Sequence, residues 1–306
     1  FCWWEGKMRE AAVRSDVRER STGPLGSPYA AQVITKVPNW DLLTALDVLL
    51  NNLAVGTFLA VALCWLLAPA DFGPLVPWAL LLALALLGAD LLLLVADLGD
   101  PWRFHHMLRV VKPRSPMSVG TWSLSLFGTG LGLAALASVL RLLGGPDWLN
   151  WVVAAVTFLA VIPAVGSILY KGVLFSVTSQ PGWQDARWLG GYISNSAILL
   201  GCSLLLALAA VAGQGEAAAV LRAALLGLLL LDVVFFFLFY RGIAKVFRQR
   251  YGENGRLFFW LSVVALGWIV PFLLLLQGEI VEMVPAVFLL VGALAVRIGF
   301  VYLPRR

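Results

Sequence analysis

The sequence predicts an all-α, polytopic membrane helix bundle with about eight transmembrane helices. Its 306 residues are 61% hydrophobic and only 13% charged, whereas a soluble domain carries roughly 25% charged residues. The apolar residues also gather in long runs, close to the roughly 20 residues that a transmembrane helix needs. These two observations exclude a soluble globular domain.

Eight apolar runs follow a charged N-terminal segment, and short turns such as PADFGP and GGPD join alternate pairs of runs. We therefore expect residues 1–40 to form a cytoplasmic tail or surface helix, and residues 41–306 to form the transmembrane domain. The runs lie at 42–68, 74–97, 118–143, 149–177, 187–212, 218–243, 257–277 and 281–303.

Basic residues are divided unevenly between the two sides of the predicted bundle. Of the 22 Lys and Arg residues, only Arg141 and Arg222 fall on one side, which leaves 22 − 2 = 20 on the side that holds both termini. The positive-inside rule assigns the richer side to the cytoplasm, so we expect a multi-pass protein of the cell inner membrane with cytoplasmic termini. The net charge of +5 suits a membrane surface and requires no nucleic-acid partner.

Polar side chains interrupt the first two runs. Thr44, Asp47 and Asn51 are spaced by three and then four residues, so they share one helix face. Asp90 lies inside the second run. A carboxylate is costly in lipid, so Asp47 and Asp90 are expected to handle a ligand or protons. Thr44 and Asn51 suit either a ligand site or simple hydrogen bonds between helices.

The most polar stretch after the tail is residues 97–122, DLGDPWRFHHMLRVVKPRSPMSVGTW. Lipid cannot solvate it, so we expect a loop and helix ends that build a site at one membrane face. His105 and His106 each suit a proton acceptor near neutral pH or a hydrogen-bonding loop residue. Asp97 suits a proton path or a loop anchor paired with Arg103.

Histidine and cysteine positions limit the cofactors of this chain. The two histidines are adjacent, so they cannot ligate a haem from facing helices, and a bis-His haem is excluded. Cys2, Cys64 and Cys202 are scattered without a CxxC pair. This spacing argues against an Fe–S cluster or a zinc site within the chain.

The polar stretch resembles the signature of the NrfD/polysulfide reductase membrane-subunit family, whose usual form is DLGxPxRFxHML followed by SPMSxGxW. Three later elements resemble that family's YxGxLL, GxxxP and GxxxxR in the same order. The resemblance therefore covers most of the chain outside the tail. The matching residues are Asp97, Leu98, Gly99, Pro101, Arg103, Phe104, His106, Met107, Leu108, Ser115, Pro116, Met117, Ser118, Gly120, Trp122, Tyr170, Gly172, Leu174, Gly267, Pro271, Gly292 and Arg297.

The resemblance implies a haem-free, quinone-reactive membrane subunit of a respiratory oxidoreductase complex. Its ligand would be a quinone or menaquinone, and its direct partner a four-cluster, ferredoxin-like Fe–S subunit. Through that subunit it would serve a molybdopterin or cytochrome catalytic subunit, which acts on the terminal substrate. In the polysulfide reductase member, polar residues of the first run and the tyrosine of YxG approach the quinone. Those positions are Thr44, Asp47 and Tyr170 here.

The predicted site combines these residues. Contact with the quinone ring or its protonation is assigned to Asp47, His106 and Tyr170. The quinone-binding set is Thr44, Asp47, Asn51, Arg103, His105, His106, Trp122 and Tyr170. The proton path is assigned to Asp90, Asp97 and Asp232, the last near the middle of the sixth run. Three tryptophans suit either interfacial anchors or walls for a flat ring: Trp102, Trp122 and Trp183.

Two other classes of protein remain compatible with the sequence. An ion-coupled secondary transporter would use Asp47, Asp90 and Asp232 as coupling sites and would need inverted halves with broken helices. A purely structural membrane anchor would tolerate an amide in place of each carboxylate.

The uneven distribution of basic residues predicts the orientation of the chain. A reporter enzyme that is active only in the cytoplasm, fused after Arg306, should be active, because the basic side is retained there. The matched fusion to a reporter that works only in the periplasm should be silent. The reverse pattern would contradict the predicted orientation.

Overall fold

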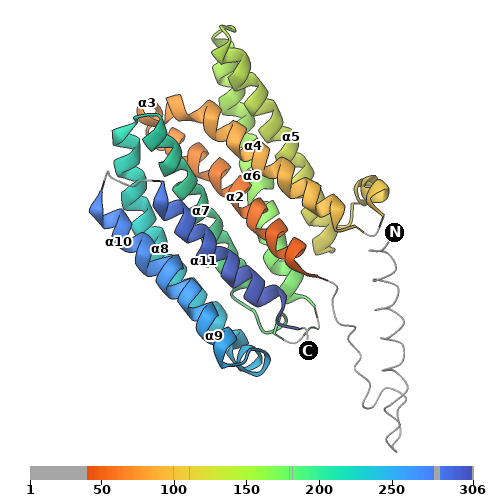
Figure 1. Cartoon of the computed structure of the whole chain (residues 1–306). Coiled ribbons are helices and arrows are strands. Elements are labelled where there is room, and N and C mark those ends of the chain that lie inside the picture. Colours follow the sequence, from red (N-terminus) through yellow and green to blue (C-terminus); the bar gives the residue numbers. More distant parts are fainter. Residues whose placement is uncertain are drawn as a thin grey trace, which may run out of the picture. The chain divides into compact units, whose positions relative to one another are not determined.

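We describe the structure of the chain from a computed structural model. The chain separates into two units, residues 1–38 and 39–306. The structure describes residues 40–98, 100–109, 111–178, 180, 182–278 and 283–304, so the predicted tail at 1–40 lies outside the described residues except for Trp40. Within them, every regular element is a helix (Figure 1).

Eight helices of the described chain are long and apolar enough to cross a membrane, which confirms the predicted fold class. Two of them are composite: α3, η2 and α4 form one, and α9, the π-helix η4 and α10 form another. The elements are α2 (Leu42–Leu67), α3 (Pro69–Phe72), η2 (Gly73–Leu75), α4 (Val76–Ala96), η3 (Pro101–Leu108), α5 (Pro116–Leu142), α6 (Trp148–Ser176), α7 (Leu189–Val211), α8 (Gly215–Arg250), α9 (Glu253–Trp260), η4 (Leu261–Ile269), α10 (Val270–Gln277) and α11 (Val284–Val301).

Local chemistry explains where several helices begin and turn. The Asp41 carboxylate accepts a hydrogen bond of 2.9 Å from the Leu43 amide and caps α2. Pro116 occupies the first position of α5, where a missing amide hydrogen costs nothing. Gly144 has a φ of 90° in the turn between α5 and α6, a conformation that favours glycine.

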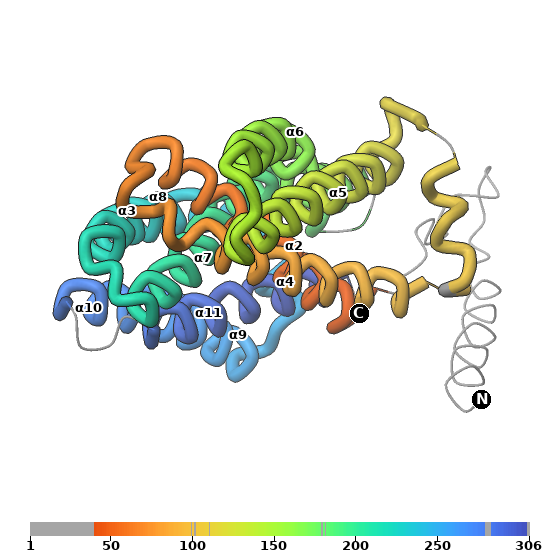
Figure 2. The backbone as a smooth tube through the Cα atoms, turned by 90° about the horizontal axis from the view of Figure 1, so that it is seen from above, coloured from red at the N-terminus to blue at the C-terminus, as the bar shows by residue number. Residues whose placement is uncertain are grey.

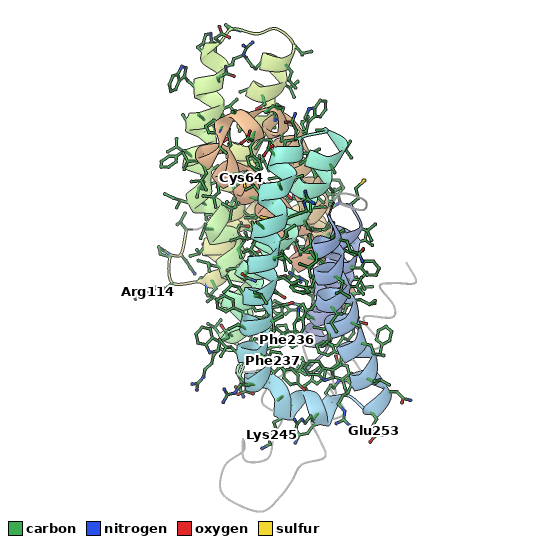
Figure 3. All side chains as sticks on the ribbon, turned by 90° about the vertical axis from the view of Figure 1, so that its left-hand side faces the viewer. Cys64, Arg114, Phe236, Phe237, Lys245 and Glu253 are labelled. Carbon is green, nitrogen blue, oxygen red and sulfur yellow. The ribbon has the colours of Figure 1, made fainter. Side chains whose placement is uncertain are left out.

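Two segments differ from the predicted boundaries. The interval between the apolar runs at 218–243 and 257–277, where a loop would be expected, instead holds the last turns of α8 and the start of α9, and Figure 3 shows Lys245 and Glu253 near that end. Lys, Arg and Gln are good helix formers, so the helix continues beyond the apolar run. The expected loop at 98–117 contains the eight-residue 3₁₀ helix η3. An apolar run in the sequence marks the part of a helix that lipid surrounds, whereas the helix propensity of the following residues determines where the helix ends.

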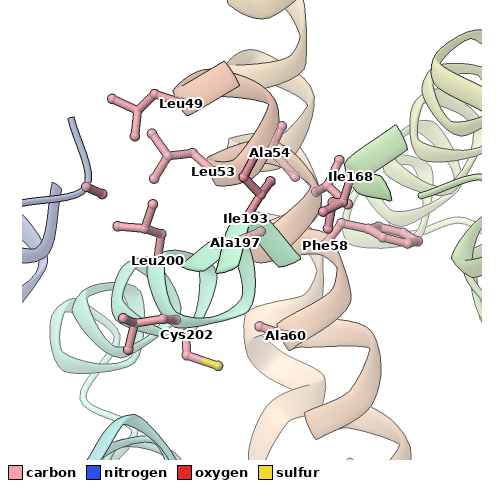
Figure 4. Close-up of a cluster of buried hydrophobic side chains, with 14 of the residues drawn as sticks. Leu49, Leu53, Ala54, Phe58, Ala60, Ile168, Ile193, Ala197, Leu200 and Cys202 are labelled. Atoms are coloured by element: carbon pink, nitrogen blue, oxygen red, sulfur yellow. The ribbon is translucent and has the colours of Figure 1, made fainter. Parts of the chain in front are cut away.

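Helix α2 runs through the middle of the described helices, where it contacts α4, α6, α7 and α11 (Figure 2). Helices α2 and α7 are the most enclosed spans, because 67% of an 18-residue apolar segment is buried inside the protein in each of them. Figure 4 shows the buried apolar cluster where the two helices meet, with Leu53 of α2, Ala197 of α7 and Ile168 of α6 among its side chains. The Asn52 amide adds a hydrogen bond of 3.1 Å to the carbonyl oxygen of Ile193.

The crossing of α2 and α7 depends on two glycines. A Cβ on Gly56 would overlap the carbonyl oxygen of Ala197, and a Cβ on Gly201 would overlap the backbone of Gly56. Lipid tails are as apolar as leucine, so spans associate through close packing of this kind rather than through hydrophobic burial. The remaining contacts divide the bundle into α2–α6 and α7–α11, joined mainly along α2 and α7.

This crossing generates a stability prediction. Gly56→Ala should destabilise the protein by about 1–3 kcal/mol, because the new methyl group displaces backbone rather than a flexible side chain. Gly88→Ala is the matched control, since a Cβ there meets no atom within 4 Å. Thermal unfolding in one detergent should show a lower midpoint for Gly56→Ala only. Equal midpoints for both variants would contradict the proposed role of the crossing.

Candidate functional site

A cavity of about 230 Å³ lies where the ends of α2, α4 and α6 meet. Its polar groups are Thr44 and Asp47 from α2, Asp97 at the end of α4, and Tyr170 and Lys171 from α6. Apolar side chains form the rest of the wall: Trp40, Val48, Leu94, Leu98, Met107, Met117, Leu174 and Phe175. The site is thus a mostly apolar cavity with a few polar groups in its wall, as small-molecule sites commonly are.

Two buried oxygen atoms in this cavity have no hydrogen-bond partner in the part of the chain that the structure describes. They are the hydroxyl oxygen of Thr44 and Oδ1 of Asp47. Buried polar atoms are nearly always satisfied by protein, water or a ligand. Both residues line the cavity, so the side chains that carry these two buried oxygens stand beside any molecule bound there.

Lys171 joins two carboxylates beside the cavity. Its ammonium group donates to Oδ2 of Asp47 at 2.9 Å, to the Asp47 carbonyl oxygen at 3.1 Å and to Oδ1 of Asp90 at 3.4 Å. The Lys171 side chain is 3% exposed and that of Asp90 0%, whereas that of Asp47 is 13% exposed and lines the cavity. A charge buried this deeply requires a partner, and each of these has one.

An amide and a hydroxyl continue this network into the bundle. Asn51 donates to Oδ2 of Asp90 at 3.3 Å and to the hydroxyl of Ser167 at 3.0 Å. Asn51 and Asp90 are both fully buried and do not line the cavity. They therefore form a second layer behind Asp47 and Lys171.

Aromatic rings hold one wall of the cavity. The Trp40 ring stacks on Trp183 with 4.9 Å between centroids and meets Phe175 edge-on at 5.0 Å. Trp183 is itself fixed, because its indole N–H donates to the Phe300 carbonyl oxygen at 2.9 Å. Of the three tryptophans considered from the sequence, Trp183 does not line the cavity but supports Trp40, which does. Trp102 is 85% exposed.

The glycines of the motif elements permit close approaches. A Cβ on Gly120 would overlap the ring of Tyr170, so this glycine of the polar stretch seats the tyrosine beside the cavity. A Cβ on Gly172 would lie 2.5 Å from the Cα of Gly190, and one on Gly267 would lie 3.0 Å from the Cα of Gly292. The small residues of the three later elements thus fix how α6, η4 and α11 meet their neighbours.

The polar stretch itself contributes less to the cavity than the sequence suggests. Arg103 is exposed and pairs with Asp100 at 3.0 Å. His106 is exposed and its Nδ1 lies 3.1 Å from a guanidinium nitrogen of Arg109, and the rings of His105 and His106 lie 4.3 Å apart. None of these residues lines the cavity, nor does Trp122; Met107 is the residue of η3 that does.

A second buried polar cluster lies in the other half of the bundle. Asp232 accepts hydrogen bonds from Asn195 at 3.3 Å and from the indole of Trp268 at 3.2 Å. Arg297, 4% exposed, donates to Ser196 at 3.3 Å. A space of only about 10 Å³ adjoins Asp232 and Ser196, which is room for about one water molecule. Asp232 is thus separate from the cavity and its network.

The two clusters share one plan. In each half an asparagine of the first span donates to an aspartate of the second span, Asn51 to Asp90 and Asn195 to Asp232, both at 3.3 Å. The last span of each half supplies the base, Lys171 or Arg297. The two clusters differ in charge. The first contains two carboxylates and one basic side chain, whereas the second contains one carboxylate and one basic side chain.

The structure thus gathers Thr44, Asp47, Asp97 and Tyr170 at the cavity and places Asn51 and Asp90 behind it. Sequence reasoning missed Trp40 and Lys171. Lys171 was counted among the basic residues of the cytoplasmic side, and so was Arg297, yet both are buried. The one signal in the sequence is their position six residues inside an apolar run, which a surface cation near the end of a span can share.

Eight apolar spans define a polytopic helical membrane protein, and one buried cavity with charged residues lies in its first half. The sequence profile of the family described as "Polysulphide reductase, NrfD" matches residues 33–303, nearly the whole chain, so the chain belongs to that family of membrane subunits of oxidoreductase complexes. This confirms the resemblance noted in the sequence. A search of curated proteins found no match.

The second cluster generates a prediction of asymmetric stability. Asp232→Asn should destabilise the protein by about 3–5 kcal/mol, because Arg297 is left charged, buried and unable to lose its proton. Arg297→Met should cost less, because Asp232 can take up a proton and become neutral. The double variant should recover part of the loss of Asp232→Asn. Thermal midpoints measure this, and equal effects of both single variants with no recovery would contradict the pairing.

Proposed function

We propose that this chain is the haem-free, quinone-reactive subunit of a respiratory complex in the inner membrane, with cytoplasmic termini. It would exchange electrons between membrane quinone or menaquinone and an Fe–S partner subunit. The observation that carries this proposal is the cavity of about 230 Å³, whose mostly apolar wall also holds Thr44, Asp47, Asp97, Tyr170 and Lys171. Thr44 and Asp47 each carry a buried oxygen that has no partner among the described residues. Family membership supports the class of partner and ligand.

The chemistry of the wall suits a flat ring with an oxygen at each end and an apolar tail. Trp40 offers an indole face held by Trp183, and aromatic faces bind planar rings well. Tyr170 and Thr44 carry hydroxyl groups, and Asp47 carries an acceptor oxygen. Leu94, Val48 and the other aliphatic residues of the cavity suit the tail.

A quinone supplies two-electron, two-proton redox chemistry when it is bound, and the residues of this chain would orient it and exchange its protons. Asp47 would accept or return a proton at Oδ1, and the Tyr170 hydroxyl would hydrogen-bond to the ring. A general acid–base group placed in this way contributes about 100-fold or more to the rate of a step.

The partner subunit would sit at the face that carries η3. There Trp102 and Phe104 are exposed beside Arg103, and Met107 of the same helix reaches the cavity wall. Exposed aromatic and arginine side chains are typical of protein contacts. We therefore propose that Arg103, His105 and His106 serve the four-cluster Fe–S subunit or bring protons to this face. The molybdopterin or cytochrome subunit would lie beyond that partner.

The test is binding of decylubiquinone and a short-chain menaquinone to the purified full chain, read from quenching of tryptophan fluorescence. Leu94→Phe should raise the dissociation constant about tenfold or more, because a bulkier side chain fills the cavity. Leu92→Phe is the matched control, since Leu92 is 74% exposed on the same helix. Trp40→Phe should reduce the quenching of the bound state. Absence of quenching, or equal affinity of both phenylalanine variants, would contradict a quinone in this cavity.

A further inference from the structure

We propose that Asp47, Asp90 and Lys171 hold one proton in common, and that Lys171 is the positioning residue that keeps the Asp47 carboxylate ready to take it up. This deepens the proposed function and rests on it for the identity of the proton donor in the cavity. The motif elements of the sequence do not single out Lys171.

The geometry makes the three side chains one unit. The Lys171 ammonium group lies between the two carboxylates, 2.9 Å from Oδ2 of Asp47 and 3.4 Å from Oδ1 of Asp90. Lys171 donates to one oxygen of each carboxylate. The other oxygen of Asp90 accepts from Asn51, whereas the other oxygen of Asp47, Oδ1, is buried and has no hydrogen-bond partner among the described residues. Asp47 lines the cavity and Asp90 does not, so Asp47 is the member of the unit that a proton from the cavity reaches first.

The balance of charge requires such a proton. Two ionised carboxylates and one ammonium group give −2 + 1 = −1, and the unit is enclosed among apolar spans. A net charge in such surroundings is costly, and neutralising one carboxyl group removes it. The other titratable side chains facing the unit are Tyr170 on α6 and Asp97 at the end of α4, both in the cavity wall. Neither supplies a second positive charge.

The second half of the bundle provides an internal comparison. The described residues of that cluster include one carboxylate, Asp232, and one base, Arg297, which gives a sum of zero, and the adjoining space is about 10 Å³. That cluster needs no extra proton and has no room for a ligand ring. The surplus acid, Asp47, occurs in the half whose cluster opens onto the large cavity.

The proton transfer involves no change of oxidation state. As Asp47 accepts, the O–H bond of a ligand hydroxyl breaks, its electron pair stays on the ligand oxygen, and a new O–H bond forms at Oδ1 of Asp47. Lys171 keeps its charge and its contact with Asp47, so it stabilises the carboxylate before the transfer. The transfer takes place when the unit has released its shared proton and carries −1, so the arriving proton returns the sum to zero.

Infrared spectroscopy of the full chain in nanodiscs at neutral pH tests the proposal, because protonated carboxyl groups absorb apart from ionised ones. Difference spectra between the native protein and its variants should show one protonated carboxyl group that disappears in Asp47→Asn and equally in Asp90→Asn, since either change leaves one acid and one base. Lys171→Met should double that band, because two carboxylates then lack a cation. Lys171→Arg should leave it unchanged.

Two controls guard against misfolding and general effects. Lys171→Met combined with Asp90→Asn restores a sum of −1, so it should fold and show one protonated group. Glu216→Gln, at an exposed carboxyl group in the first turn of α8, should leave the band unchanged. A band that is absent from the native protein, or that disappears in only one of the two aspartate variants, overturns the shared proton. Quinone binding is a separate measurement, so its failure would refute the proposed function and leave the infrared result standing.

Discussion

The exclusion of unpaired charge from lipid governs the arrangement of this protein. Lys171 and Arg297 can lie inside apolar spans only where other spans bring them acidic or hydrogen-bonding partners. The first half therefore has to bring α2, α4 and α6 together at one level, because Asp47, Asp90 and Lys171 come one from each. The cavity is what remains beside that meeting point, where Asp47 is the member that is not fully enclosed.

Close helix packing makes this arrangement possible. The contact of Gly56 with Ala197 and Gly201 sets α2 deep in the bundle, so its polar face points to other spans and not to lipid. Gly120 does the same on a smaller scale, since the absence of its side chain leaves the space that the Tyr170 ring fills. These glycines thus allow the close packing that positions the polar side chains of the site.

Much of the fold was predictable, because hydropathy alone marks spans that lipid must surround. Asp47 and Thr44 were also predictable, since a polar face on an apolar helix must point inward, and Tyr170 was predictable from the resemblance to the family. Lys171 was not, because its sequence position near a span end suits a surface cation equally well, and only the positions of Asp47 and Asp90 decide between the two. His106 and Arg103 stand in the most specific motif, yet the turn of η3 directs them away from the cavity.

The same arrangement of an asparagine, an aspartate and a basic residue in both halves bears on how the chain evolved. Four crossings bring a polypeptide back to the side on which it started, so α2–α6 and α7–α11 are each complete units with both ends on one face. Two such units can be joined in tandem without reversing either of them. Ancestral duplication of a four-helix gene would account for the matching pairs Asn51–Asp90 and Asn195–Asp232. Divergence would then have left one copy open to ligand and the other closed.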